Sequence, residues 1–227
     1  MSFSNWILQP ETVLCASPVM PVVQIKEINH AIPLATAILA GGINTLEITL
    51  RTPMALEAIK LLRQTFPEAL IGVGTIVTPE QLEASITAGA QFAFSPGTTS
   101  ALLTAGRDFN IPFIPGVSNV SDLMEGIAIG YTHFKFFPAV AAGGISLLQA
   151  LYGPFPQARF CATGGLNERN YREFLALPNV MCIGGSWIIP EDSVKKGDWA
   201  EITKLCRAAC QNVVSWGFPN GTARQLR

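Results

Sequence analysis

The sequence predicts an α/β protein folded as a single (β/α)8 TIM barrel with a short N-terminal helix. Short apolar runs typical of strands alternate with helix-like segments, which implies right-handed crossovers and a parallel sheet. Eight such units recur at a spacing of roughly 20 to 26 residues, as in a compact barrel. An open doubly wound sheet usually carries G-x-G-x-x-G after its first strand, whereas this chain continues as Ile25-Lys26-Glu27-Ile28.

Each expected element follows from local pattern. The expected strands are Val19–Ile25, Thr45–Leu50, Leu70–Ile76, Phe92–Pro96, Phe113–Val117, His133–Phe137, Arg159–Gly164 and Met181–Ser186. The expected helices between and after them are Ile32–Ala40, Pro53–Thr65, Pro79–Ala88, Ser100–Asn110, Val120–Ile129, Gly144–Leu151, Asn167–Leu175 and Asp198–Trp216. Residues 1–17 are expected to form a short helix and a connector, and residues 217–227, which are polar and broken by Pro and Gly, a frayed tail. No linker divides the chain, so residues 1–227 are interpreted as one domain.

Helix ends carry their own signals. Gly41-Gly42 and Gly89 follow helical segments and suit C-terminal caps. Thr52-Pro53 and Thr78-Pro79 each place a capping hydroxyl before a proline at the first helical position.

Composition limits the classes of function. The chain has 227 residues, of which 49% are hydrophobic and 14% charged, and this predicts a compact protein with a large core. A net charge of -1 argues against nucleic-acid binding and against a polybasic membrane patch. Apolar runs stay shorter than a membrane span, and the N-terminus does not resemble a secretory signal. Five cysteines without metal-type spacing are typical of reduced thiols, so a cytoplasmic location is expected.

The segment His133–Ala139 contains the first candidate catalytic residue, Lys135. In a strand, Phe134 and Phe136 share one face, and Lys135 shares the other with His133 and Phe137. A lysine among aromatic side chains is a candidate nucleophile that forms a Schiff base with a carbonyl, because burial disfavours its charged form. The structural alternative is a lysine whose stem covers apolar surface while its ammonium reaches water.

A second candidate lies on strand Thr45–Leu50. Thr45, Glu47 and Thr49 alternate with apolar residues and should face the barrel axis, as should Arg51 beyond them. Glu47 is therefore a candidate general base. The alternative is a structural ion pair between Glu47 and Arg51, but four residues along a strand separate them by roughly 13 Å.

Glycines mark the expected phosphate end. Gly164-Gly165 follows Thr163 after strand seven, and Gly184-Gly185 precedes Ser186 after strand eight. Barrels of this kind bind phosphate there, through backbone N–H groups and helix N-termini; ordinary tight turns are the alternative. Thr75 and Pro96 end strands three and four at the same barrel face, where Pro96 by itself indicates a turn.

Nothing in the sequence indicates a metal site or another cofactor. His30 is expected at a helix start and His133 near the bottom of the barrel, and the chain has no H-E-x-x-H and no Cys/His spacing of the metal-binding kind.

The motifs together resemble the bacterial 2-keto-3-deoxy-6-phosphogluconate (KDPG) and 4-hydroxy-2-oxoglutarate (KHG) aldolases, in order from about Pro18 to Cys206. The segments that carry the resemblance are Leu46–Thr52, Gly72–Thr75, Ser95–Gly97, Ile114–Val117, Phe134–Ala139, Thr163–Gly165 and Ile183–Trp187. Two positions depart from the usual pattern, Val140 and Ala162; both border the expected substrate end and leave open the preference among related keto acids.

This resemblance implies a metal-free class I aldolase, a carbon–carbon lyase that splits KDPG into pyruvate and glyceraldehyde 3-phosphate and also acts on 4-hydroxy-2-oxoglutarate, and that assembles as a homotrimer. It implies that Lys135 forms the Schiff base and that Glu47 moves protons through a water. It assigns the keto-acid carboxylate region to Arg51, Thr75 and the turn at Pro96, and packing against the bound carbons to Phe137. It assigns the distal hydroxyl and phosphate end to Thr163, Gly164, Gly165, Gly184, Gly185 and Ser186.

Three alternatives remain open at this point. The same mechanism could act on the galactonate epimer. A phosphosugar isomerase or epimerase could use Glu47 as a base without an imine. A barrel that only binds sugar phosphates, as a sensor or scaffold, would leave the inward Glu47 and Lys135 unexplained.

Overall fold

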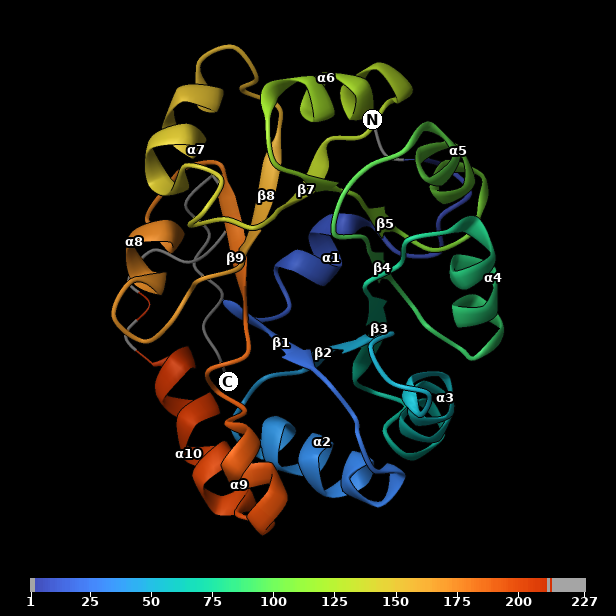
Figure 1. Cartoon of the computed structure of the whole chain (residues 1–227), viewed down its shortest axis with the longest axis vertical. Coiled ribbons are helices and arrows are strands. Elements are labelled where there is room, and N and C mark those ends of the chain that lie inside the picture. Colours follow the sequence, from blue (N-terminus) through green and yellow to red (C-terminus); the bar gives the residue numbers. More distant parts are fainter. Residues whose placement is uncertain (1–2, 212, 214–227) are drawn as a thin grey trace.

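The computed structural model describes residues 3–211 and 213. It contains a nearly closed barrel of parallel strands surrounded by helices (Figure 1), as the sequence predicts. The strands are β1 (Val19–Val23), β2 (Thr45–Thr49), β3 (Leu70–Gly74), β4 (Ala93–Phe94), β5 (Phe113–Ile114), β6 (Gly116–Val117), β7 (His133–Phe136), β8 (Arg159–Thr163) and β9 (Val180–Gly185). The helices are α1 (Pro10–Leu14), the 3-10 turn η1 (Ile28–His30), α2 (Ala31–Ala40), α3 (Ala55–Thr65), α4 (Pro79–Thr87), α5 (Ser100–Asp108), α6 (Val120–Ile129), α7 (Gly144–Tyr152), α8 (Tyr171–Leu175), α9 (Glu191–Lys196) and α10 (Trp199–Cys210).

Two of these strands are halves of the fifth expected strand. The sheet order is β5-β4-β3-β2-β1-β9-β8-β7-β6, and all of its pairings are parallel. Because Pro115 has no N–H to donate, the strand is interrupted between Ile114 and Gly116. The first half pairs with β4 and the second with β7, so this one segment joins the two ends of the sheet.

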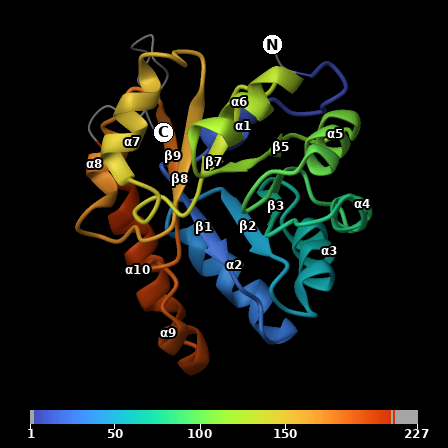
Figure 2. The ribbon, with the colours of Figure 1, turned by 45° about the horizontal axis from the view of Figure 1, so that its top comes forward.

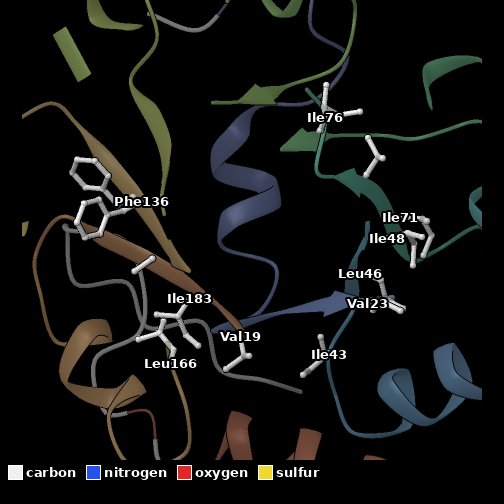
Figure 3. Packing of buried hydrophobic residues seen from close by; sticks show 14 of the residues in the cluster. Val19, Val23, Ile43, Leu46, Ile48, Ile71, Ile76, Phe136, Leu166 and Ile183 are labelled. Atoms are coloured by element: carbon white, nitrogen blue, oxygen red, sulfur yellow. The ribbon is translucent and has the colours of Figure 1, made fainter. Parts of the chain in front are cut away.

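Side chains alternate between two layers as the strand pattern predicts. The outer layer packs under the helices, and Figure 3 shows Val19, Leu46 and Ile183 on the side of their strands that faces away from α1. Inside the barrel, Val13 and Leu14 of α1 form a separate buried cluster with Met20, Phe92, Phe94, Ile114, Cys161 and Cys182. Helix α1 therefore closes the end of the barrel where the strands begin, and Figure 1 shows it within the ring of strands. Burial raises the pKa of the Cys182 thiol, which is typical of a cysteine used for packing.

Several element ends differ from the sequence-based expectation. Thr78 caps α4 as predicted, since its hydroxyl accepts from the N–H of Gln81. Thr52 does not cap α3, which begins at Ala55; its hydroxyl donates to the carbonyl of Ile25 instead. This hydrogen bond joins two loops at the open end of the barrel that are 27 residues apart in the sequence, and a local sequence pattern does not show such a contact.

Two differences concern the last third of the chain. Helix α8 begins at Tyr171, four residues after the expected Asn167, because the side chains of Asn167 and Asn170 hydrogen-bond to backbone N–H groups and hold a turn there. Helix α9 was not expected; Figure 2 shows it beside the lower end of α10. The expected helix Asp198–Trp216 is α10, ending at Cys210, and its last residues, like the tail 217–227, lie outside the described part.

Candidate active site

Lys135 and Glu47 meet inside the barrel. Nζ of Lys135 lies 2.8 Å from Oε1 of Glu47, and the two side chains are 6% and 0% exposed. They come from β7 and β2, which are separated in the sheet by β1, β9 and β8, so the pair spans the barrel interior. Glu47 thus contacts Lys135 rather than Arg51. A buried ion pair of this kind costs desolvation energy, and removing one partner would leave an uncompensated charge.

Aromatic rings surround the lysine ammonium. Nζ lies 5.2 Å from the ring centroid of Phe94 and 5.7 Å from that of Phe137. These rings exclude water, and their faces attract the charged form of the amine. Lys135 is therefore enclosed rather than reaching water, so the alternative of a lysine that extends to solvent is wrong.

One carboxylate oxygen of Glu47 lacks a hydrogen-bond partner in the described part of the chain. Among the described residues, none hydrogen-bonds to Oε2, although this atom is fully buried. Buried carboxylate oxygens are normally satisfied by a donor. A hydroxyl group of a bound molecule, or a water held by it, is the donor this position calls for.

A cavity of about 490 Å³ opens above the pair, at the end of the barrel where the strands finish. Eight of the residues expected in the site line it: Arg51, Phe137, Thr163, Gly164, Gly165, Gly184, Gly185 and Ser186. Lys135 and Glu47 lie just below; Val22, which lines the cavity, is the register partner of Glu47 on β1. Phe137, two residues after Lys135 in the chain, also lines the cavity, so the cavity lies next to the buried amine.

Thr75 and Pro96 do not line this cavity. Thr75 follows Gly74 at the end of β3 and has a positive φ of 64°, an uncommon conformation for a β-branched residue. Pro96 is partly buried, and its carbonyl lies where a side chain at Gly116 would stand. Both lie at the ends of strands on the β3–β4 side, and their contact with a bound keto acid remains a prediction.

Four glycines line the cavity where two neighbouring strands end: Gly164 and Gly165 follow β8, and Gly184 and Gly185 are the last two residues of β9. Gly164 and Gly165 have φ values of 104° and 79°, which residues with a side chain rarely adopt. A Cβ atom on Gly184 would overlap the hydroxyl of Thr163. These glycines thus bring bare backbone to the cavity wall. They lie several residues before α8 and α9, so the helix starts expected directly after them are not there.

Sequence reasoning missed part of the cavity. Gln24, Glu27 and His30 come from the segment after β1, and Glu191 and Lys195 from α9. Their position after a strand was the only signal for the first three.

His133 lies at the other end of the barrel, 3.4 Å from Glu11 of α1, and burial lowers its pKa to about 4. Within the described chain, His, Cys, Asp and Glu side chains form no group of three or more that could hold a metal ion.

A parallel barrel with a cavity at its C-terminal face, and with a buried amine beside a carboxylate beneath it, is the architecture of an aldolase that works through a lysine. The family model "KDPG and KHG aldolase" matches residues 11–205. The chain belongs to this family, and it is a carbon–carbon lyase.

Individual relatives agree. A 2-dehydro-3-deoxy-phosphogluconate aldolase of Pseudoalteromonas atlantica is 52% identical over 205 residues, which cover 90% of this chain and 95% of the relative. The KHG/KDPG aldolase of Escherichia coli K12 is 51% identical over 207 residues, covering 91% and 97%. The crystal structure of a KDPG aldolase from Legionella pneumophila, with pyruvate captured at low pH as a covalent carbinolamine intermediate, has 57% identity and a TM-score of 0.89 and covers 90% of this chain and 100% of that one.

Proposed function

We propose that this protein is a Schiff-base aldolase that cleaves 2-keto-3-deoxy-6-phosphogluconate to pyruvate and glyceraldehyde 3-phosphate, and also 4-hydroxy-2-oxoglutarate to pyruvate and glyoxylate. The observation that carries the proposal is the buried contact between Nζ of Lys135 and Oε1 of Glu47 beneath the cavity. A carboxylate at this distance can take a proton from the amine and leave its lone pair free to attack a carbonyl.

The reaction begins at the keto carbon. Nζ of Lys135 adds to C2 to form a carbinolamine, and loss of water gives a protonated imine. The imine draws electrons from the neighbouring C3–C4 bond, so no metal is needed to stabilise the carbanion. Glu47 accepts the proton of the C4 hydroxyl, directly or through a water. Its unpartnered Oε2 is the atom that can receive this donor.

Bond cleavage then releases the aldehyde. As the C4 oxygen loses its proton, the C3–C4 bond breaks and its electrons form an enamine on Lys135. Glu47 returns a proton to C3, which regenerates an imine, now of pyruvate. Water adds to this imine and releases pyruvate and the free amine. Each step uses the same two side chains, which is why their contact matters.

The substrate placement that we propose is the one implied by the resemblance to the family, and the residues that line the cavity support part of it. Arg51 would pair with the carboxylate of the keto acid, with Thr75 and the turn at Pro96 beside it, and the ring of Phe137 would pack against the carbons near Lys135. Thr163, Gly164, Gly165, Gly184, Gly185 and Ser186 would receive the distal hydroxyl and the phosphate through backbone N–H groups and hydroxyls. The galactonate epimer differs at one hydroxyl, and assays with both epimers would decide between them.

Assembly and location complete the proposal. We propose a homotrimer, because the resemblance to the family implies one, and light scattering of the purified protein tests it. None of the five cysteines is joined to another in a disulfide bond, in keeping with the cytoplasm. Within residues 3–211 and 213, no helix combines the length and apolar character needed to cross a membrane.

Borohydride trapping tests the chemistry. The protein is treated with pyruvate and borohydride, and peptides are mapped by mass spectrometry. A pyruvate-sized adduct on Lys135, absent from Lys135→Arg, is expected. A folded protein without any adduct would contradict the imine mechanism and favour the isomerase alternative. An adduct on Lys26, the other lysine near the C-terminal end of a strand, would support the imine mechanism but assign the Schiff base to a different residue.

A further inference from the structure

Three charged side chains at the rim of the cavity take no part in the proposed reaction. Nζ of Lys26 lies 2.7 Å from Oε1 of Glu191, and Nζ of Lys195 lies 2.8 Å from the same oxygen atom. All three side chains line the cavity. One carboxylate oxygen thus holds two ammonium groups at the entrance.

The position of this cluster in the barrel places it near the glycine turns. Lys26 follows β1, and α9 follows β9 after the turn at Ser186. Strands β1 and β9 are paired neighbours, with Met20 opposite Gly184. The two lysines therefore lie beyond Gly184–Ser186 at the end of β9, on the side of the cavity proposed to receive phosphate, while Lys135 lies below on β7.

The charges favour an anion with more than one negative charge. The two lysines lower the pKa of Glu191 to about 2, so this carboxylate is ionised at neutral pH. Hydrogen bonding to Glu191 in turn raises the pKa of Lys195. A phosphate oxygen accepts from ammonium groups in the same way as the carboxylate oxygen does, and a phosphate brings up to two charges where Glu191 brings one.

Rearranging the cluster would cost little. The side chains of Lys26, Glu191 and Lys195 are 52%, 57% and 63% exposed, and ion pairs this open to solvent contribute little to stability. Glu27 also lines the cavity, whose charged lining residues are the cationic Lys26, Arg51 and Lys195 and the anionic Glu27 and Glu191. The loss of Glu191, or its displacement from between the lysines, leaves the ammonium groups free to bind another anion.

We propose that Lys26 and Lys195 form an anion clasp that binds the terminal phosphate of the substrate, and that Glu191 holds the two ammonium groups over the cavity until the phosphate displaces it. This inference rests on the proposed function and deepens it: the clasp makes the enzyme prefer phosphorylated keto acids to 4-hydroxy-2-oxoglutarate. Glu191 acts as a built-in competitor that weakens binding of anions with a single charge.

Kinetics with two substrates test the clasp. Lys26→Met and Lys195→Met should each raise KM for the phosphorylated substrate by about threefold to tenfold, the range expected for a solvent-exposed charge contact, and leave kcat/KM for 4-hydroxy-2-oxoglutarate within about twofold. Glu191→Gln should lower KM for the phosphorylated substrate by about threefold. Lys204→Met is the matched control, since Lys204 forms an exposed ion pair with Glu201 on α10 at 3.0 Å, away from the cavity.

Binding of inorganic phosphate to the resting protein gives an independent readout. Calorimetry should show weaker binding in the Lys26→Met/Lys195→Met double variant and tighter binding in Glu191→Gln, and both differences should shrink as ionic strength rises. Unchanged phosphate binding in the double variant, or equal losses on both substrates, would overturn the clasp. Failure of pyruvate trapping on Lys135 would instead overturn the proposed function, and the phosphate titration would then decide the clasp by itself.

Discussion

Gly74 leaves open the space that the carboxylate of Glu47 occupies. A Cβ atom on Gly74 would overlap Oε1, Cδ and Cγ of Glu47. The two residues lie on the neighbouring strands β3 and β2, and the overlap comes from the inward side of both. The absence of a side chain at position 74 therefore fixes where Glu47 can point, and with it the contact to Lys135.

Gly74→Ala should lower kcat by about a hundredfold, because a displacement of a catalytic group by about 1 Å has an effect of this size. The fold should survive with a lower melting temperature, since the added methyl group must displace a buried side chain. Steady-state assays and thermal unfolding measure both effects. Gly153→Ala is the control, because a Cβ atom there meets no atom of the described chain within 4 Å; full activity in Gly74→Ala would contradict the role given to Glu47.

Glu47→Gln should lower kcat by about 10²- to 10⁴-fold, the usual contribution of a general base. The amide keeps the shape of the carboxylate but cannot take a proton from the C4 hydroxyl. Borohydride should still trap pyruvate on Lys135, because Lys135 supplies the amine that forms the imine. Trapping should be slower, because the glutamine cannot take the proton from that amine. A variant that keeps kcat within about threefold would show that another group moves the protons.

Thr75→Gly should separate backbone strain from substrate contact. Glycine adopts a positive φ without the roughly 1–2 kcal/mol that a left-handed conformation costs other residues, although it also loses more chain entropy on folding. We expect almost unchanged stability in chemical denaturation but a kcat/KM reduced by about tenfold, the effect of one lost hydrogen bond to a charged group. Thr75→Ser keeps the hydroxyl and should retain most of the activity. Equal activity in all three proteins would leave Thr75 with a purely conformational role.

The barrel should lose stability in mild acid through His133. Burial lowers the pKa of this imidazole to about 4 in the folded protein, while a free histidine has a pKa near 6.5. Between these values the unfolded chain binds more protons, so the free energy of unfolding falls as pH falls from about 6.5 to about 4 and is unaffected by His133 above that window.

The magnitude of this effect is set by the pKa difference and is about 3 kcal/mol; the pKa of about 4 already includes the opposing effect of the nearby Glu11. His133→Gln should flatten the dependence of the unfolding free energy on pH between 4 and 6.5. His30→Gln, at the other end of the barrel, should keep it. Urea unfolding at several pH values makes the comparison, and a slope that persists in His133→Gln would assign the acid sensitivity to other groups.

Much of the barrel could be predicted from sequence because its strands repeat one pattern. The alternation in Thr45–Leu50 and His133–Phe137 is enough to turn Glu47 and Lys135 inward. Their direct contact was not predicted, because it depends on how the strands tilt as the sheet closes, and on the empty position at Gly74. Neither property is local to the two segments.

Other features of the structure were not predicted correctly, and each has a physical reason. Glu191–Lys196 has a single apolar residue, Val194, so α9 gives no apolar periodicity; its ion pairs run to Lys26 and within the helix. Thr52 matched a capping pattern but donates to the carbonyl of Ile25, in the segment after the neighbouring strand β1. Polar groups in loops choose partners that are distant in sequence, and the rim of the cavity consists of such loops.

The closure of the barrel by α1 has a consequence for the traffic of reactants. Val13 and Leu14 fill the end opposite the cavity, so within the described part of the chain reactants approach Lys135 from the cavity side. Pyruvate, attached to the deepest group, must be the last to depart in cleavage and the first to arrive in condensation. An aldehyde that binds in the cavity before pyruvate blocks the access of pyruvate to Lys135. High aldehyde concentrations should therefore inhibit the condensation reaction, as expected for an ordered mechanism in which the second substrate has bound first.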